Sequence, residues 1–218
     1  WPPTWFTVLF NPQAGVDSRP MVGLSLALNY AMTGLEVEGY HATNILLHIA
    51  CAMTYFSFLR NFLRCQTDDG RFATDSAAFF CALVWAVHPL NSQAVNYMIQ
   101  RSELLMGLFY LLTLHCGLQA ITTNQPRWRW AAIGFCALGM GSKESMASAP
   151  IVVLALDRFF FCSSLLQCLR TRTIFYAGLA GCWLLLAGLI SRGGHMGTIG
   201  FSADVKSWQY ALNQADVI

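Results

Sequence analysis

The chain has 218 residues and a formal net charge of +2; 56% of its residues are hydrophobic and only 11% are charged. This composition excludes an ordinary soluble domain and is typical of proteins with several membrane-spanning helices. It predicts a lipid bilayer as a partner, and nothing in it indicates nucleic acid. The chain begins with Trp1, ends without a polar tail and has no signal peptide, so we expect a piece of a longer protein.

The first predicted element is a helix over 20–34, preceded by residues 1–18, which we assign to the end of an outer loop. Pro20 can start the helix and Gly34 can end it, and apolar side chains recur between them at helical spacing (Met21, Leu24, Leu28 and Met32). Fifteen residues cannot cross a bilayer. We therefore expect an interfacial helix on the outer face, with Arg19 beside the headgroups. The alternative is a helix packed across the bundle.

The region 40–190 predicts an all-α polytopic transmembrane helix bundle with about six crossing helices. The mainly apolar runs are 40–60, 75–87, 103–121 and 173–190. Two shorter runs, 129–141 and 145–157, form either half-helices or a tilted pair that meets at the turn GSKES. The final segment, 191–218, is expected to be an outer-face loop.

The basic residues predict an orientation, because Lys and Arg in short connections favour the cytoplasmic side. Eight of the thirteen fall on connections that would share one face: Arg60, Arg64, Arg71, Arg127, Arg129, Arg158, Arg170 and Arg172. The other face holds most of the acidic residues and the remaining cations, Arg19, Arg101, Lys143, Arg192 and Lys206. We interpret it as non-cytoplasmic. The protein would be integral and multi-pass, in the endoplasmic reticulum membrane of a eukaryote or the inner membrane of a bacterium.

None of the eight cysteines lies in an expected outer connection, so we expect no disulfides. No CxxC pair suggests a metal site, and we assign no metal ligands.

A polar stripe follows one face of the run that begins at Tyr40, formed by His41, Asn44, His48 and Tyr55. Such a stripe can supply hydrogen bonds between helices. It could instead supply ligands. The two histidines lie two turns apart, about 10.5 Å, so they cannot hold one metal ion. A haem would need a ligand from another helix, for which His115 is a candidate.

The stretch HPLNSQAVNYMIQRSELL, residues 88–105, is a polar interruption between two apolar runs. Charges beside lipid are costly unless they face water, a partner or a substrate, so this stretch is a candidate site. Arg101 is suited to grip a phosphate with two parallel hydrogen bonds; its alternatives are a salt bridge to Glu103 or a lipid headgroup. Glu103 could equally stabilise the start of a helix after Ser102.

A second group of charges, Lys143 and Glu144, lies in the turn GSKES, where charges can also simply meet water. With Arg19, His88 and Arg101 they map to the same face. Together the cations there could neutralise a lipid-linked phosphate or diphosphate.

Five blocks in register resemble the membrane domain of GT-C glycosyltransferases: SRPMVGLSLALNYAMTG, GYHATNILLH, LVWAVHPLNSQAV, QRSELL, and GSKES followed by LALD. The similarity is greatest to the tetratricopeptide-containing group that includes the transmembrane O-mannosyltransferases acting on cadherins, and to its bacterial relatives. It runs from Arg19 to Asp157 and continues more weakly through RGGHMGTIGF and WQYALNQ.

This resemblance implies an enzyme that transfers a sugar, expected to be mannose, from a polyprenyl-phosphate carrier to a Ser or Thr hydroxyl of an acceptor protein on the non-cytoplasmic side. It implies no further cofactor. The family's acidic catalytic motif precedes the segment matching SRP, so we expect it upstream of Trp1 and do not assign its role to Asp17. The chain contains no 34-residue repeat, and we expect the tetratricopeptide repeats beyond its end.

For phosphate binding we select Arg101 first, with Lys143 and Arg19 as supporting cations. We expect Arg101→Ala to abolish transfer and to leave expression intact. The other expected binding residues hold the loop or the sugar, or reach the same cavity: His88, Glu103, Glu144, His41 and Asn44.

Two other functions agree with the residues. A multi-pass transporter or channel could line its path with the polar stripe, and solute uptake by the purified protein in liposomes would favour it. A noncatalytic membrane scaffold, derived from a transferase, is the second. The absence of a paired acidic motif in the upstream sequence would favour that one.

Overall fold

The computed structural model describes residues 19–66 and 71–192, and over this part of the chain it contains helices and turns but no strand. The all-α fold is thereby confirmed. The helices, in chain order, are α2 (Pro20–Thr33), α3 (Val37–Gln66), α4 (Arg71–Ala86), α5 (Asn91–Asn96), η2 (Met98–Gln100), α6 (Arg101–Thr123), α7 (Pro126–Met140), η3 (Glu144–Ser148), α8 (Ala149–Phe160), α9 (Leu165–Thr171) and α10 (Thr173–Arg192). The expected loop 1–18 and most of 191–218 lie outside the described residues.

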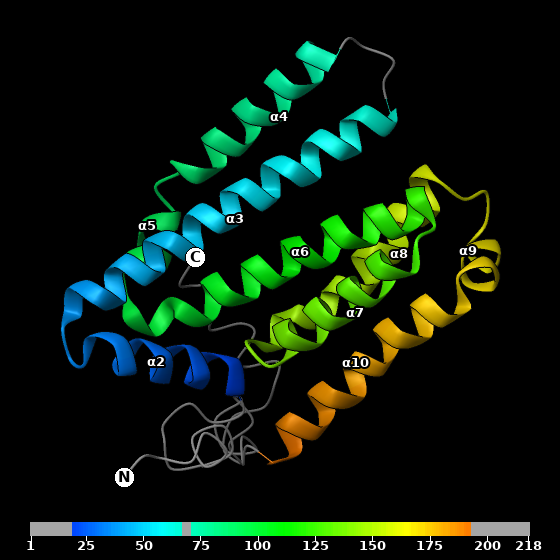
Figure 1. The fold of residues 1–218 in the computed structure, drawn as a ribbon. Coiled ribbons are helices and arrows are strands. Elements are labelled where there is room, and N and C mark those ends of the chain that lie inside the picture. Colours follow the sequence, from blue (N-terminus) through cyan, green and yellow to red (C-terminus); the bar gives the residue numbers. More distant parts are fainter. Residues whose placement is uncertain (1–18, 67–70, 193–218) are drawn as a thin grey trace, which may run out of the picture.

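The long helices run alternately in opposite directions, so their ends gather at two ends of the bundle (Figure 1). We call one the basic end; it holds the ends of α3, α6 and α8 and the starts of α4, α7 and α10. We call the other the Arg101 end; it holds the starts of α3 and α6 and the ends of α4 and α7, with α2 beside them. The two groups of charged connections thus lie at opposite ends, as predicted. Which end faces the cytoplasm stays a prediction.

Three of the described helices are long and apolar enough to cross a membrane, namely α3, α6 and α10. A fourth crossing would be a broken one, in which the segment Glu144–Phe160 and α9 meet at 111°. The helices α4 and α7, with 16 and 15 residues, are shorter, so the expected number of six stays a prediction.

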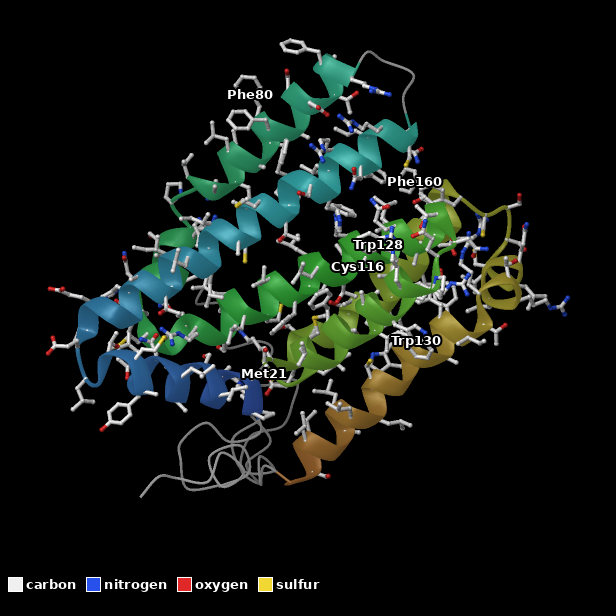
Figure 2. The ribbon with its side chains drawn as sticks, in the orientation of Figure 1. Met21, Phe80, Cys116, Trp128, Trp130 and Phe160 are labelled. Atoms are coloured by element: carbon white, nitrogen blue, oxygen red, sulfur yellow. The ribbon has the colours of Figure 1, made fainter. Side chains whose placement is uncertain are left out.

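Helix α6 lies in the middle of the bundle, between α3 on one side and α7 and α8 on the other (Figure 1). Its core face packs closely because Gly117 has no side chain: a Cβ there would lie 3.2 Å from Cγ1 of Val153 in α8. Figure 2 shows Cys116 and Trp128 in this region. Small residues at such contacts let helices approach, which is how helices associate in lipid.

The helix predicted over 20–34 is observed within one residue of its expected end. Pro20 occupies its first turn, and Gly34 follows it with φ 61°, a left-handed backbone that favours glycine. Leu28 and Met32 are exposed on α2. They are therefore available to lipid, and the interfacial position of α2 stays a prediction.

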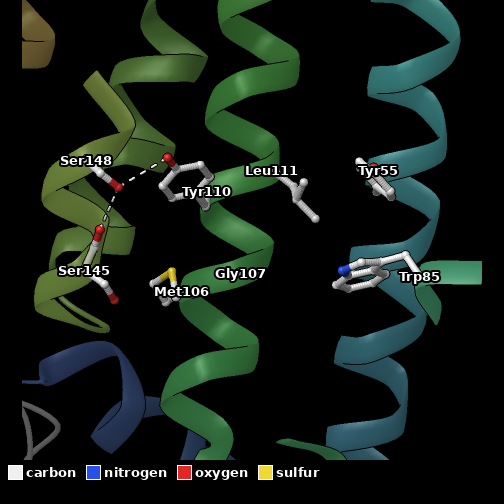
Figure 3. A pocket seen from close by; sticks show the side chains of 8 residues that line it. All are labelled: Tyr55, Trp85, Met106, Gly107, Tyr110, Leu111, Ser145 and Ser148. Atoms are coloured by element: carbon white, nitrogen blue, oxygen red, sulfur yellow. Dashed lines mark hydrogen bonds between the residues drawn. The ribbon is translucent and has the colours of Figure 1, made fainter. Parts of the chain in front are cut away.

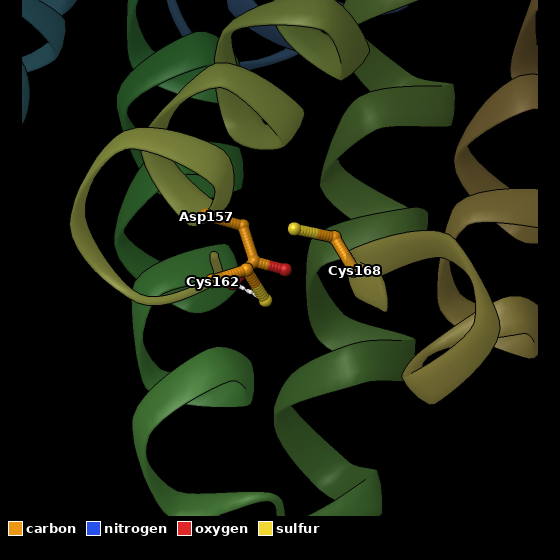
Figure 4. Close-up of side chains that lie close together, drawn as sticks. All are labelled: Asp157, Cys162 and Cys168. Atoms are coloured by element: carbon orange, nitrogen blue, oxygen red, sulfur yellow. Dashed lines mark hydrogen bonds between the residues drawn. The ribbon is translucent and has the colours of Figure 1, made fainter. Parts of the chain in front are cut away.

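At the basic end, a fully buried carboxylate fixes the corner between α8 and α10. Arg172 Nη1 donates to both oxygens of Asp157, at 3.2 and 3.0 Å, and the hydroxyl of Tyr176 donates to Oδ2 at 2.5 Å. Cys162 and Cys168 lie beside this carboxylate, with all three ligand-type atoms within 4.8 Å (Figure 4). Because the guanidinium already occupies both carboxylate oxygens, we interpret the cluster as a buried ion pair.

Candidate functional site

The side chain of Arg101 is fully buried, with 0% of its surface exposed, at the first residue of α6. Its Nε donates to Oδ1 of Asn44 at 2.9 Å, and Nη2 donates to the carbonyl oxygen of Tyr40 at 3.0 Å. The carbonyl of Ser25 lies 3.5 Å from Nη1. The guanidinium also lies 5.5 Å from the ring centroid of Tyr40. One cation therefore joins α6 to α3 and α2.

All the acceptors around Arg101 are neutral, and none of the described carboxylates pairs with it. The salt bridge to Glu103, one of the alternatives to phosphate binding, is not formed, because Glu103 pairs with Lys143. A buried guanidinium keeps its charge, so its field acts on its surroundings with little screening. Arg101 as the first phosphate ligand stays a prediction, because in this structure its donors face protein oxygens.

The polar stripe of α3 makes hydrogen bonds and ring contacts between helices. Asn44 accepts from Arg101 through Oδ1 and donates through Nδ2 to the carbonyl of Val95, at 3.2 Å. His48 Nε2 lies 2.9 Å from the carbonyl of Ala86, and its ring stacks on Trp85. These contacts confirm the interpretation of the stripe as a source of interhelical hydrogen bonds. They also separate His48 in space from His115, which contacts Trp128 near the basic end.

Two ion pairs lie at the Arg101 end and join residues that are far apart in the sequence. Lys143 Nζ pairs with Oε1 of Glu103, with side chains 27% and 34% exposed. Arg19 pairs with Glu144 at 3.3 Å, with side chains 34% and 42% exposed. Unlike Arg101, these four groups reach the surface. They can exchange partners with a ligand.

Of these five charged residues, Arg101 alone pairs with none of the described carboxylates, because the other four form the two ion pairs. Glu36 and Glu38 also lie at this end, at the start of α3, so the positive charge is local to the guanidinium. A buried cation attracts an anion, and the two partly exposed cations can contact it.

A pocket of about 440 Å³ lies between α3, α4, α6 and η3 (Figure 3). It is mostly apolar and is lined by Tyr55, Trp85, Met106, Gly107, Tyr110, Leu111, Ser145 and Ser148. Gly107 follows Glu103 by one helical turn, and Ser145 is the neighbour of Glu144. Its polar side is formed where Ser148 Oγ donates to the hydroxyl of Tyr110 at 3.2 Å. The pocket therefore offers an apolar surface directly beside charged groups.

Two expected site residues are separate from this network. His88 is exposed, and its Nδ1 accepts from the backbone N–H of Leu90 at 3.3 Å, so it holds the turn before α5. His41 is half-buried on α3, and none of the hydrogen bonds described for this part of the chain involves it. Conversely, the backbone carbonyls of Ser25 and Tyr40 join the site although nothing in their side chains predicted it.

Comparisons with known proteins agree with the resemblance. Residues 69–190 match the family described as dolichyl-phosphate-mannose-protein mannosyltransferase. Human protein O-mannosyl-transferase TMTC2 is 32% identical over 162 residues, which cover 72% of this chain and 18% of that protein. Human protein O-mannosyl-transferase TMTC4 is 32% identical over 169 residues (72% and 22%), and Tmtc3 of Drosophila melanogaster is 30% identical over 118 residues (49% and 13%).

The chain thus spans 13% to 22% of the length of these three relatives. No solved structure matches it.

Proposed function

Because this chain belongs to the dolichyl-phosphate-mannose-protein mannosyltransferase family, we propose that it forms the donor-binding part of a larger membrane enzyme. That enzyme transfers mannose from a polyprenyl-phosphate carrier to a Ser or Thr hydroxyl of an acceptor protein. The transfer takes place on the non-cytoplasmic side of a multi-pass membrane domain, to which the Arg101 end belongs.

The observation that carries this proposal is the group of three cations at the Arg101 end: Lys143 and Arg19, which are partly exposed, and the buried Arg101, which no described carboxylate neutralises. A polyprenyl-phosphate sugar is a phosphodiester with one negative charge, which such cations can bind. Lys143 and Arg19 bind the phosphate after they separate from Glu103 and Glu144. The buried Arg101 does not contact the phosphate but stabilises its negative charge electrostatically. The apolar pocket beside these pairs receives the first part of the prenyl chain.

The chemistry divides between this segment and the rest of the enzyme. An acceptor hydroxyl attacks the anomeric carbon, a carboxylate takes its proton, and the carrier phosphate leaves with the electron pair of the broken C–O bond. The cations of the Arg101 end stabilise that leaving phosphate. We assign the base to an acidic motif upstream of Trp1. Glu103 and Glu144 hold the cations until the donor arrives.

The test uses the full-length protein and labelled polyprenyl-phosphate mannose with an acceptor protein. Lys143→Ala and Arg19→Ala should each lower transfer by about 100- to 1000-fold, the range for the loss of one charge-stabilising group. Arg64→Ala, which removes a cation paired with Asp75 at the basic end, is the matched control and should keep its activity. Wild-type transfer by both Lys143→Ala and Arg19→Ala would contradict the proposal.

A further inference from the structure

Two cysteines at the basic end approach each other at the corner between α8 and α10. Cys162 lies in the connection just after α8, and Cys168 lies within the short helix α9. The chain bends by 111° between the segment Glu144–Phe160 and α9. Because of this bend, the two sulfurs point into the same space from the two arms of the corner, and they lie within 4.8 Å of each other (Figure 4).

Both sulfurs are held only by weak contacts. Cys162 Sγ donates to Oδ1 of Asp157 at 3.5 Å and accepts from Nη1 of Arg172 at 3.5 Å. Cys168 Sγ donates to the carbonyl oxygen of Ser164 at 3.3 Å. Thiols are weak donors and acceptors, so little is lost when either side chain changes its rotamer. Such a change swings the sulfur around the Cα–Cβ bond, and the two sulfurs can thereby reach the bonded distance of about 2.05 Å.

The two thiols differ in their access to solvent. Cys162 is half-buried, whereas 0% of the surface of Cys168 is exposed. The residues between them, 163–167, are all exposed, so the corner lies at the surface of the bundle. A small reagent therefore reaches Cys162 first, and Cys168 reacts with the product from inside. An accessible cysteine next to a second, resolving one is the usual arrangement of a redox-active pair.

We propose that Cys162 and Cys168 form a reversible disulfide by exchange with a small-molecule disulfide. The sulfur of Cys162 attacks one sulfur of the reagent, whose S–S bond breaks, and the departing sulfur keeps the electron pair and takes the proton of the Cys162 thiol. The sulfur of Cys168 then attacks the sulfur of Cys162, and the second half of the reagent leaves with the proton of Cys168. The protein thus loses two electrons and two protons, and the reagent gains them as two thiols.

The new bond alters the corner at which the buried ion pair lies. A disulfide sulfur carries no hydrogen, so Cys162 no longer donates to Asp157, whose described partners are then Arg172 and Tyr176. The bond also ties α9 to the end of α8. We predict that the basic end faces the cytoplasm, where protein disulfides are usually transient and redox-sensing. The site is independent of the proposed sugar transfer, since it lies at the opposite end of the bundle from Arg101.

The test is mass spectrometry of tryptic peptides from the full-length protein. The protein is incubated in detergent, without denaturant, with mixtures of reduced and oxidised glutathione, and free thiols are then blocked by alkylation. Both cysteines, and no other, lie in the peptide 159–170, between Arg158 and Arg170. In the wild type this peptide should lose two hydrogen atoms and take up no alkyl group, and an excess of reduced glutathione should reverse the change. Cys65, which is exposed and lies in another tryptic peptide, should gain glutathione and shows that the reagent is active.

Single serine variants distinguish the roles of the two cysteines. Cys168→Ser should stop at the mixed disulfide, with glutathione bound to Cys162. Cys162→Ser should keep Cys168 as a free thiol, because the reagent does not reach the buried sulfur directly. Glutathione bound to Cys168 in one variant to the same extent as to Cys162 in the other would overturn the proposed order of attack.

Two results in the wild type would overturn the disulfide itself. One is a peptide 159–170 that keeps both free thiols while Cys65 carries glutathione. The other comes from the same titration in urea. Cysteines six positions apart can also pair in an unfolded chain, so the folded protein should give a several-fold higher ratio of disulfide to mixed disulfide than the unfolded one. An equal or lower ratio would show that the corner does not bring the sulfurs together.

Discussion

Nε of Arg101 and Oδ1 of Asn44 lie 2.9 Å apart, and both side chains are fully buried. Asn44 also donates to the carbonyl of Val95, so one amide group joins the start of α6 to the end of α5. The sequence predicts Arg101 at the membrane surface, but this contact holds its side chain inside the helix bundle. Arg101 is thereby a structural residue first, and its effect on a ligand acts through its charge.

Replacing Arg101 by Ala should destabilise the protein. The substitution removes three hydrogen bonds and leaves Asn44 without its donor, so we expect a loss of roughly 3 kcal/mol. Thermal unfolding in detergent measures it, with Arg127→Ala, an exposed arginine, as the control. The structure therefore changes our expectation that expression stays intact. An unchanged melting temperature in Arg101→Ala would show that the buried network is not formed.

Exchanging the charges of Lys143 and Glu103 tests their ion pair. Lys143→Glu and Glu103→Lys each place like charges opposite one another, so each should lower the melting temperature, whereas the double variant should recover most of the loss. The coupling should be modest, about 1 kcal/mol or less, because both side chains are partly exposed. A double-mutant cycle measures it. Additive losses would mean that the two groups do not interact.

Removing Arg172 should be far more damaging than removing its neighbour Arg170. Arg172→Met leaves the buried carboxylate of Asp157 with only Tyr176 and Cys162 as partners, which costs about 3–5 kcal/mol in comparable pairs. Arg170→Met alters an exposed side chain at the end of α9 and should be nearly neutral. Unfolding midpoints of the two variants give the comparison. Similar midpoints would argue against the ion pair.

Two glycines of α7 should respond differently to the same added methyl group. A Cβ at Gly139 would lie 2.7 Å from Sδ and Cε of the fully buried Met146, so Gly139→Ala should cost about 1–3 kcal/mol. A Cβ at Gly134 meets nothing within 4 Å, and Gly134→Ala should be neutral or slightly stabilising, because alanine favours a helix. Thermal unfolding again separates them. Equal effects would show that Met146 does not hold η3 against α7.

Filling the pocket should weaken binding of the donor substrate without destabilising the fold. A Cβ at Gly107 meets nothing within 4 Å, so Gly107→Leu can place its side chain in the space that we assign to the prenyl chain. In the full-length protein we expect KM for the polyprenyl-phosphate donor to rise about tenfold, the value of roughly 1.4 kcal/mol of lost binding. Gly134→Leu, in α7 away from the pocket, is the control. Unaltered donor kinetics in Gly107→Leu would exclude this pocket.

Much of the fold follows from local signals in the sequence. Pro20 and Gly34 predict α2 because one suits a first helical turn and the other a left-handed end. Lys143 and Glu144 were expected at a turn, and the chain there forms a short η3 between two shorter helices. The two charged ends could be predicted because basic connections alternate with the other connections along the chain. Each antiparallel helix returns the chain to the opposite end, so connections of one kind gather at one end.

The partners of the buried charges could not be predicted in the same way. The sequence predicts Arg172 only as one of several basic residues in a connection. In the structure it pairs with Asp157 at the corner between α8 and α10, and no local sequence pattern predicts that contact. Arg101 was expected to meet a phosphate because the sequence does not reveal that Asn44 and two backbone carbonyls enclose it. Backbone acceptors carry no residue-type signal. The stripe containing Asn44 was the one available hint.

The contact between Arg19 and Glu144 also constrains the order in which the protein can be assembled. These residues are 125 positions apart, and the backbone N–H of Met21 donates across the same interface to the carbonyl of Gly141, at 3.1 Å. At roughly 5–20 residues per second, a ribosome needs on the order of ten seconds to make the intervening chain. The start of α2 is therefore synthesised before all the other described helices but can reach its final position only after α7 has emerged.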